Sequence, residues 1–309
     1  MTTAASKIRN IAFVGHPSSG KTALVDALAF LTGVTPRKGS VTDKTSICDT
    51  EPEEQEKGHT LQTKVVSANW HGELWTFFDS PGYPDFQAEA NGALFAADLV
   101  VGVVSCASYN LRKKMEAAAK LGRGRAIIVT HLDDPKADFD ALVEALRHGI
   151  GEKCVPYLLP DASGPSFSRV RKTMQDPESP WRQALMDEVM DACENEAEVM
   201  QYLETQAVTD EELHELMPKA LVEGKVIPIL VCNPVSELGL KEVAEFFEHY
   251  APGAAQIHFK MEDGTEVPPD PNGDLLGTVF NVKSDPHVGK VCLARIYRGT
   301  LNTTSAIVG

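Results

Sequence analysis

The most informative residues of this chain form one short stretch, Gly15-His16-Pro17-Ser18-Ser19-Gly20-Lys21-Thr22. They follow the apolar run Ile11–Val14, which is typical of a buried strand, and lead into Thr22–Leu31, where apolar residues recur at helical spacing. In this context G-x-x-x-x-G-K-[ST] indicates a phosphate-binding loop, whose backbone N–H groups and helix dipole face phosphate oxygens. Lys21 is expected to bridge the terminal phosphates, and the Thr22 hydroxyl to coordinate Mg²⁺. The alternative, a glycine-rich turn that only caps a core helix, is disfavoured by this context, so the sequence predicts a nucleoside triphosphate site.

Short apolar runs alternate with helix-like stretches along most of the chain. Buried strands are predicted at Ile11–Val14, Leu99–Val104, Ala126–Thr130, Val155–Leu159 and Ile227–Val231, and a hairpin at Lys64–Trp70 and Glu73–Asp79 that turns at His71-Gly72. Further helices are predicted at Tyr109–Leu121, Lys136–Gly149 and Leu240–Tyr250. This alternation implies an α/β fold with a mostly parallel sheet and helices on both faces. We expect about six strands, one of them an antiparallel edge strand, with nucleotide at the carboxyl ends of the parallel strands.

The alternation of strands and helices is interrupted between about residues 160 and 226. The interruption opens with a proline-, serine- and glycine-rich stretch, and long acidic helices are predicted after it, at Trp181–Glu204 and Asp210–Leu221. Because the strand pattern resumes at Ile227, we interpret the segment as a helical insert within a first domain of residues 1–265.

A domain boundary is predicted at the Pro/Asp/Gly-rich stretch Glu262–Asp274. Residues 266–309 then contain two β-like runs, Leu276–Lys283 and Lys290–Arg298. Few residues remain after the boundary, so we expect the sequence to stop inside this second domain.

Composition and charge exclude several classes of function. The formal net charge is −15, whereas a general nucleic-acid binder needs a Lys/Arg-rich face. The 6 cysteines are scattered without a C-x-x-C pair, which indicates reduced thiols of a cytoplasmic protein rather than a zinc site or a disulfide framework. No apolar run approaches the roughly 18 residues of a membrane helix, and the first ten residues lack a signal-peptide core.

A second motif, Asp79-Ser80-Pro81-Gly82, stands at the carboxyl end of a predicted strand. There Asp79 can reach Mg²⁺ through water, and the Gly82 N–H can approach a γ-phosphate. The preceding stretch Gly39–Thr63 is too polar for a core, as expected of a mobile loop that folds over Mg²⁺ when the γ-phosphate is present. Without the neighbouring motifs, an ordinary surface loop would explain this stretch equally well.

Three further stretches resemble one known family. Residues 54–61, EQEKGHTL, resemble E-x-E-R-G-I-T-I, the first switch of translational GTPases, and residues 79–86, DSPGYPDF, resemble D-T-P-G-H-V-D-F, their second switch. Residues 278–300 resemble the start of domain II in elongation factor G, so residues 266–309 are expected to begin a β-barrel domain. The divergent elongation-factor-G-like group is the nearest match.

The resemblance implies a cytoplasmic GTPase with GTP/GDP and Mg²⁺ as ligands and the ribosome, its RNA and stalk proteins, as partner. Carried over by position, Thr22, Thr60 and Asp79 surround Mg²⁺. Lys21, Thr60, Gly82 and Tyr83 are the expected catalytic residues.

The chain departs from the family pattern at the second switch. Tyr83 stands where the family has the histidine that orients the attacking water. Since phosphoryl transfer depends on positioning and electrostatics, this change should slow hydrolysis without preventing nucleotide binding. A tyrosine hydroxyl can still hold a water.

The guanine-recognition motifs also depart from the family. The motif N-K-x-D reads Thr130-His131-Leu132-Asp133, in which Asp133 keeps the carboxylate that accepts from guanine N1 and N2. Thr130 is expected to lose the asparagine amide that ties this loop to the phosphate loop, and His131 replaces the lysine stem that packs on the base. In an alternative interpretation Asp133 only caps the following helix. The family's S-A turn aligns with Asn233-Pro234, and the proline lacks the N–H that meets guanine O6.

Two functions therefore compete. The first is an enzyme, a translational GTPase of the elongation-factor-G-like type whose hydrolysis is slow. The second is a GTP- or GDP-binding switch that no longer hydrolyses and whose state the ribosome or another partner reads. An unrelated P-loop ATPase is a third possibility, and Asp133 argues against it.

Overall fold

The computed structural model describes residues 3–105, 111–261, 263–285 and 288–305. Its centre is a seven-stranded sheet in the order β2-β3-β1-β4-β5-β9-β6. The strands in that order are β2 (Lys64–Trp70), β3 (Glu73–Asp79), β1 (Ile8–Gly15), β4 (Leu99–Ser105), β5 (Gly124–Thr130), β9 (Ile227–Val231) and β6 (Cys154–Pro156). Only β2 runs antiparallel to its neighbour, so the predicted mostly parallel sheet with an antiparallel edge strand is confirmed, with seven strands rather than about six.

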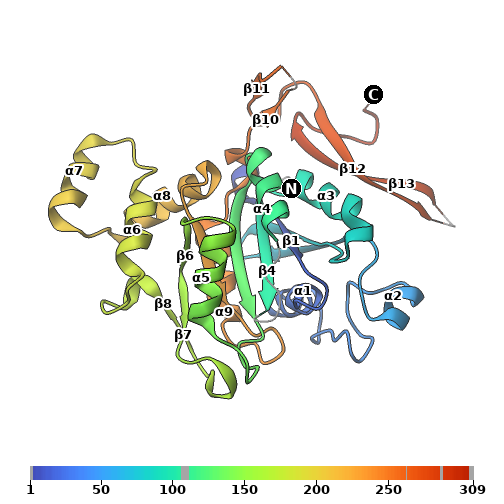
Figure 1. The fold of residues 1–309 in the computed structure, drawn as a ribbon. Helices are drawn as coiled ribbons and strands as arrows, with labels where there is room; N and C mark the ends of the chain where they lie inside the picture. The colour runs from blue at the N-terminus through green and yellow to red at the C-terminus, as the bar shows by residue number, and fades with distance from the viewer. Residues whose placement is uncertain (1–2, 106–110, 262, 286–287, 306–309) are drawn as a thin grey trace.

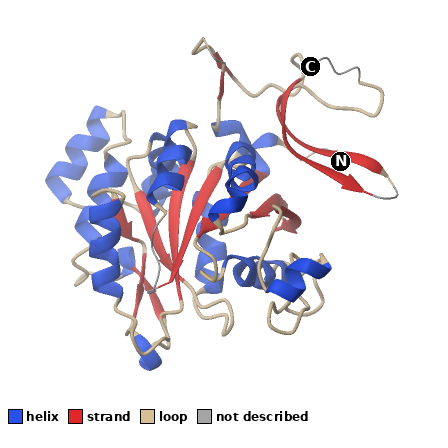
Figure 2. Ribbon diagram, turned by 45° about the vertical axis from the view of Figure 1, so that its right-hand side comes forward, coloured by secondary structure: helices blue, strands red, loops and turns tan. Residues whose placement is uncertain are grey.

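Helices cover both faces of this sheet (Figure 2). Among them are α1 (Lys21–Leu31), α3 (Gln87–Ala96), α4 (Arg112–Lys120), α5 (Phe139–Gly149) and α9 (Leu240–Tyr250). The hairpin and α9 have the predicted bounds. The helix predicted at Tyr109–Leu121 is described from Arg112, and its first two predicted residues lie outside the described part of the chain.

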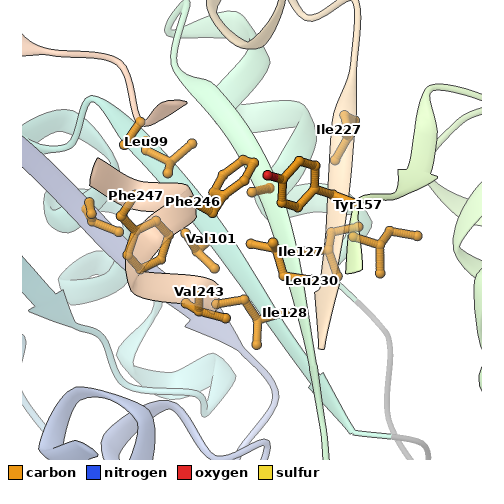
Figure 3. Close-up of a cluster of buried hydrophobic side chains, with 14 of the residues drawn as sticks. Leu99, Val101, Ile127, Ile128, Tyr157, Ile227, Leu230, Val243, Phe246 and Phe247 are labelled. Atoms are coloured by element: carbon orange, nitrogen blue, oxygen red, sulfur yellow. The ribbon is translucent and has the colours of Figure 1, made fainter. Parts of the chain in front are cut away.

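The core lies between the central strands and the helices that cover them. Figure 3 shows Val243, Phe246 and Phe247 of α9 beside side chains of β4 and β5. Phe247 is fully buried, and its ring centroid lies 6.3 Å from that of Phe13 in β1. Strands buried on both faces read as continuous apolar runs, which is why Leu99–Val104 and Ile227–Val231 were recognisable from sequence. This core fixes the carboxyl ends of β1, β3, β4 and β5, from which the site is built.

Two predicted elements are each divided in the structure. The strand predicted at Val155–Leu159 is wrong: β6 joins the central sheet, whereas β7 (Leu158–Pro160) pairs with β8 (Val170–Lys172) in a separate two-stranded sheet. The backbone turns away at Tyr157, whose N–H donates to the Ile229 carbonyl oxygen at 2.8 Å. Apolar residues continue through this turn, so the sequence pattern does not show it.

The helix predicted at Trp181–Glu204 is likewise two helices, α6 (Arg182–Met190) and α7 (Glu196–Thr205). Asn195 begins the second, because its side-chain oxygen accepts from the Ala197 N–H at 3.1 Å and so caps the helix. The third helix of this segment, α8 (Asp210–Glu223), packs against β5 and α9. Figure 1 shows α7 at the outer side of the molecule. The exact limits of the helical insert, residues 160–226, stay a prediction.

The chain after α9 forms small antiparallel sheets. Short strands β10 (Phe259–Lys260) and β11 (Glu266–Val267) pair, and the long strands β12 (Leu276–Asp285) and β13 (Gly289–Arg298) form a hairpin where β-structure was predicted. Figure 1 shows this hairpin beside α3. That it begins a β-barrel stays a prediction. In the described part of the chain no helix is long and apolar enough to cross a membrane.

Candidate functional site

The phosphate-binding loop lies at the carboxyl end of β1 and ends where α1 begins at Lys21, as the sequence predicts. Lys21 is 6% exposed, and its ammonium donates to the carbonyl oxygens of Gly15 at 3.3 Å and His16 at 2.9 Å. Burial lowers the pKa of Lys21 to about 8, with the Asp79 carboxylate acting in the opposite direction. The loop therefore holds a buried cation among its own carbonyl oxygens, facing the space that phosphates would occupy.

Three residues from separate segments converge beside Lys21. The Thr22 hydroxyl lies 2.7 Å from Asp79 Oδ2 and 3.1 Å from the Thr60 hydroxyl. Thr60 Oγ1 also lies 3.4 Å from Asp79 Oδ2 and 3.0 Å from Asp49 Oδ1. The three residues expected to surround Mg²⁺ are thus in mutual contact, and Asp49 joins them as a carboxylate that sequence reasoning missed.

This cluster fits a divalent cation. Asp79 Oδ1 and Asp49 Oδ2 are both buried and have no hydrogen-bond partner. Burial raises the pKa of Asp79 to about 7, and the Lys21 ammonium and the Thr22 hydroxyl lower it only in part. Unpartnered carboxylate oxygens beside two hydroxyls are the hard oxygen ligands that Mg²⁺ prefers. A bound cation would remove the cost of burying these oxygens without a partner.

The second switch segment packs directly on the phosphate loop. A Cβ atom at Gly82 would lie 2.5 Å from the Pro17 backbone nitrogen and 2.9 Å from Lys21 Nζ, so only glycine allows this approach. Tyr83 follows at once, is 40% exposed, and has its ring centroid 4.6 Å from that of His59 in the first switch segment. Lys21, Thr22, Thr60, Gly82, Tyr83 and His59 line one cavity of about 290 Å³. A second cavity of about 690 Å³ lies beside Gly15–Ser18 and Tyr83.

The first switch segment contains a helix that its polar composition did not suggest. Helix α2 (Pro52–Lys57) has a capping box of Glu51 and Glu54, with proline at its first position. These residues are a sequence signal that could have found it. Glu54 is fully buried, forms an ion pair with Lys64 at 2.8 Å and accepts from the Leu61 N–H at 3.0 Å. It therefore fixes the backbone immediately after Thr60.

The loop expected to hold the base follows β5, and its first residue is fully buried. The Thr130 hydroxyl donates to the Ser19 carbonyl oxygen at 2.8 Å, and the Val104 carbonyl oxygen lies 3.0 Å away. The expectation that Thr130 loses the connection to the phosphate loop is wrong, because a hydroxyl at the end of β5 reaches the same loop. The His131 ring lines the cavity, and its Cε1 would lie 3.3 Å from a Cβ atom at Gly20.

Asp133 is exposed and does not cap the following helix. Asp138 takes that position, with its side chain accepting from the Ala141 N–H at 3.0 Å. The alternative interpretation of Asp133 as a helix cap is therefore wrong.

Asn233 follows β9, next to β5 in the sheet, and its side-chain oxygen accepts from the N–H groups of Val235 and Ser236 at 3.0 and 3.2 Å.

A family model described as the elongation factor Tu GTP binding domain matches residues 6–253. The chain belongs to this family. It is thus a GTP-binding domain of the translation-factor type.

Relatives of this GTP-binding domain are similar over nearly its full length. Elongation factor G of Chlamydia trachomatis is 26% identical over 337 residues, covering 97% of this chain and 49% of that protein. An elongation factor G-like protein of Mycobacterium tuberculosis is 28% identical over 327 residues, covering 97% of this chain and 46% of that protein. A crystal structure from Thermus thermophilus superposes with a TM-score of 0.82 at 29% identity, covering 95% of this chain and 46% of that one. The chain spans about half the length of the curated relatives it matches.

Proposed function

We propose that this GTP-binding domain binds GTP and GDP with Mg²⁺, hydrolyses GTP slowly, and acts in a translation factor of the elongation-factor-G-like type. The observation that carries the proposal is the convergence of Lys21, Thr22, Thr60 and Asp79 at one cavity. The likeness to proteins named elongation factor G and elongation factor G-like supports a ribosomal role in the cytoplasm. The proposed partner is the ribosome, through its RNA and stalk proteins.

The proposed roles follow from what each residue touches. Lys21 would exchange its carbonyl partners for β- and γ-phosphate oxygens, and the Gly82 N–H would donate to the γ-phosphate. Thr22, Thr60 and Asp79 would hold Mg²⁺, which when bound supplies positive charge against the phosphates. Because phosphoryl transfer depends on positioning and charge stabilisation, these contacts account for most of the expected catalysis.

Guanine selectivity is proposed to come mainly from Asp133. Its exposed carboxylate is available to accept from guanine N1–H and N2–H, a charge-assisted pair worth roughly 1.5–3 kcal/mol that adenine cannot form. The His131 ring would pack on the base. Asn233 is proposed to shape the neighbouring loop, because its side-chain oxygen is held by two N–H groups of that loop.

A switch that binds nucleotide without hydrolysing it is the second candidate. Tyr83 favours this candidate, because it stands where the second-switch motif has the histidine that orients the attacking water. The two functions share every binding residue and differ only in the rate of the chemical step.

Nucleotide binding and single-turnover hydrolysis test both candidates. The affinities for GDP and ADP would be measured in the presence of Mg²⁺ and in the presence of a chelator. The rate of GTP hydrolysis would be measured with and without ribosomes, with the Lys21→Ala variant as the inactive reference. We expect Mg²⁺-dependent selectivity for guanine and slow hydrolysis that exceeds the reference. Hydrolysis equal to the reference under both conditions would leave the non-hydrolysing switch, and equal affinity for GDP and ADP would reject both.

Asp133→Asn sharpens the test of base recognition. Xanthine carries a carbonyl oxygen where guanine carries its N2 amino group, so an asparagine amide can donate there. We expect the variant to lose affinity for GDP and to gain affinity for the xanthine diphosphate. An unchanged preference for guanine would remove Asp133 from the base site.

A further inference from the structure

His59 and Tyr83 join the two switch segments at the phosphate end of the cavity. Their ring centroids are 4.6 Å apart with an interplanar angle of 52°, and both residues line the cavity that contains Lys21. His59 directly precedes Thr60, whose hydroxyl meets Thr22 and Asp79. Tyr83 directly follows Gly82, which packs against Lys21. Both rings are therefore one residue away from groups that border the expected metal and γ-phosphate.

The hydrogen bond of His59 determines which ring nitrogen can accept. His59 Nδ1 lies 3.1 Å from the Lys57 carbonyl oxygen. A carbonyl oxygen can only accept, so Nδ1 carries the hydrogen, and in the neutral ring Nε2 then has a free lone pair. Within the described residues no side chain or backbone group donates to Nε2. His59 thus brings an uncommitted acceptor to the wall of the cavity.

The sequence shows an exchange at the same two positions. The first-switch motif E-x-E-R-G-I-T-I has isoleucine where this chain has His59, and the second-switch motif has histidine where this chain has Tyr83. The imidazole missing from one switch is present in the other, and the structure brings the two positions into ring contact.

We propose that His59 is a catalytic residue that orients the attacking water, with Nε2 accepting a hydrogen bond from it beside the Tyr83 hydroxyl. The inference rests on the proposed hydrolysis of GTP. The water oxygen forms a bond to the γ-phosphorus, and the bond to the β,γ-bridging oxygen breaks with its electron pair remaining on GDP. The hydroxyl stays on the released phosphate, and the second water proton passes to solvent. His59 supplies orientation and is unchanged after the turnover.

Single-turnover hydrolysis of GTP, with the chain in excess and at saturating concentration, tests this role. We expect His59→Ala to hydrolyse GTP at least about tenfold more slowly than the wild type while its affinity for GTP stays within about twofold. His59→Gln keeps a carbonyl acceptor and should be intermediate. His148→Gln, at an exposed histidine of α5 away from the cavity, is the matched control and should equal the wild type.

A double variant that places a histidine in the second switch segment gives a second test of the proposal. In the His59→Ala background, Tyr83→His should recover most of the rate, because both positions face the same water. The proposal would be overturned if His59→Ala hydrolysed GTP at the wild-type rate, or if its lower rate returned to the wild-type value at saturating concentration. It would also be overturned if His59→Ala and the double variant with Tyr83→His hydrolysed GTP at equal rates. A wild type no faster than Lys21→Ala would instead show that the proposed hydrolysis itself is wrong.

Discussion

The Thr130 hydroxyl donates a hydrogen bond to the Ser19 carbonyl oxygen at 2.8 Å, joining the end of β5 to the phosphate-binding loop. Both residues are buried, and the Val104 carbonyl oxygen lies at 3.0 Å from the same hydroxyl. The connection between the base loop and the phosphate loop therefore persists without an asparagine. The His131 ring also lies close to this loop, with its Cε1 3.3 Å from where a Cβ atom at Gly20 would be.

We expect Thr130→Val to weaken GDP binding and to lower the free energy of unfolding by roughly 1–3 kcal/mol. Valine has nearly the same shape, so the change removes the donor and leaves the buried Ser19 carbonyl oxygen without its partner. Urea unfolding and GDP titration measure the two effects. Thr130→Ser retains the hydroxyl and should lose much less stability and GDP affinity. Equal losses of stability and affinity in the two variants would show that side-chain shape, and not the hydrogen bond, is responsible.

We expect Gly82→Ala to reduce affinity for GTP more than affinity for GDP. The added Cβ would stand 2.5 Å from the Pro17 nitrogen, so the second switch must retreat from the place where a γ-phosphate would lie. The loss for GTP should reach at least about tenfold, or about 1.4 kcal/mol. Gly149→Ala at the end of α5 has open space around its Cβ and serves as the control. A parallel loss of GDP affinity would show damage to the whole phosphate loop.

Local patterns predicted much of the fold, and contacts between distant segments account for what they missed. The hairpin and α9 could be placed from alternation and helical spacing, and the phosphate loop from its motif. The break at Tyr157 could not be placed from the sequence, because apolar residues continue through it. The change of direction is seen only in the structure, where β6 pairs with β9 and β7 does not. The Thr130–Ser19 hydrogen bond was missed for a related reason, because it joins residues far apart in the sequence. Asp49 was missed because its contact with Thr60 follows no motif or repeat.

We expect Arg295→Met to destabilise the contact between the β12–β13 hairpin and the central sheet. Arg295 is 9% exposed and forms an ion pair at 2.7 Å with the fully buried Asp98, and it donates to the Ala96 carbonyl oxygen at 3.0 Å. Removing it leaves a buried carboxylate that, among the described residues, keeps hydrogen bonds from Asn10 and the more distant charge of Arg123, which should cost roughly 3–5 kcal/mol in urea unfolding.

The control for this prediction is an exposed ion pair. Arg112 and Glu116 lie 2.7 Å apart on α4 with side chains 69% and 52% exposed. Such pairs contribute about 0–1 kcal/mol, so Arg112→Met should be nearly neutral. Comparable losses of unfolding free energy in Arg295→Met and Arg112→Met would mean that the buried Arg295–Asp98 pair does not specially stabilise the contact between the β12–β13 hairpin and the central sheet.

The stability of the first switch segment should depend on pH through Glu54. Glu54 is fully buried, and burial alone would raise its pKa, but the hydrogen bond and charge of Lys64 and the N–H groups of Leu61 and Glu51 outweigh this and lower the pKa. A carboxyl whose pKa is lower in the folded than in the unfolded chain stabilises the fold above the unfolded value. That contribution is lost as the pH falls through the folded value.

Glu54→Gln should therefore destabilise the protein most near neutral pH, by roughly 3–5 kcal/mol, since it leaves the largely buried Lys64 ammonium without its carboxylate partner. The difference from the wild type should shrink as the pH falls through the lowered pKa of the folded Glu54 carboxyl, because the wild-type side chain is then itself protonated. Urea unfolding across this range measures it, with the exposed neighbour Glu53→Gln as control. Because Glu54 holds the Leu61 N–H directly after Thr60, the variant should also bind GTP less tightly while GDP affinity changes little. A destabilisation that stays constant with pH would show that the charge of Glu54 does not stabilise this switch.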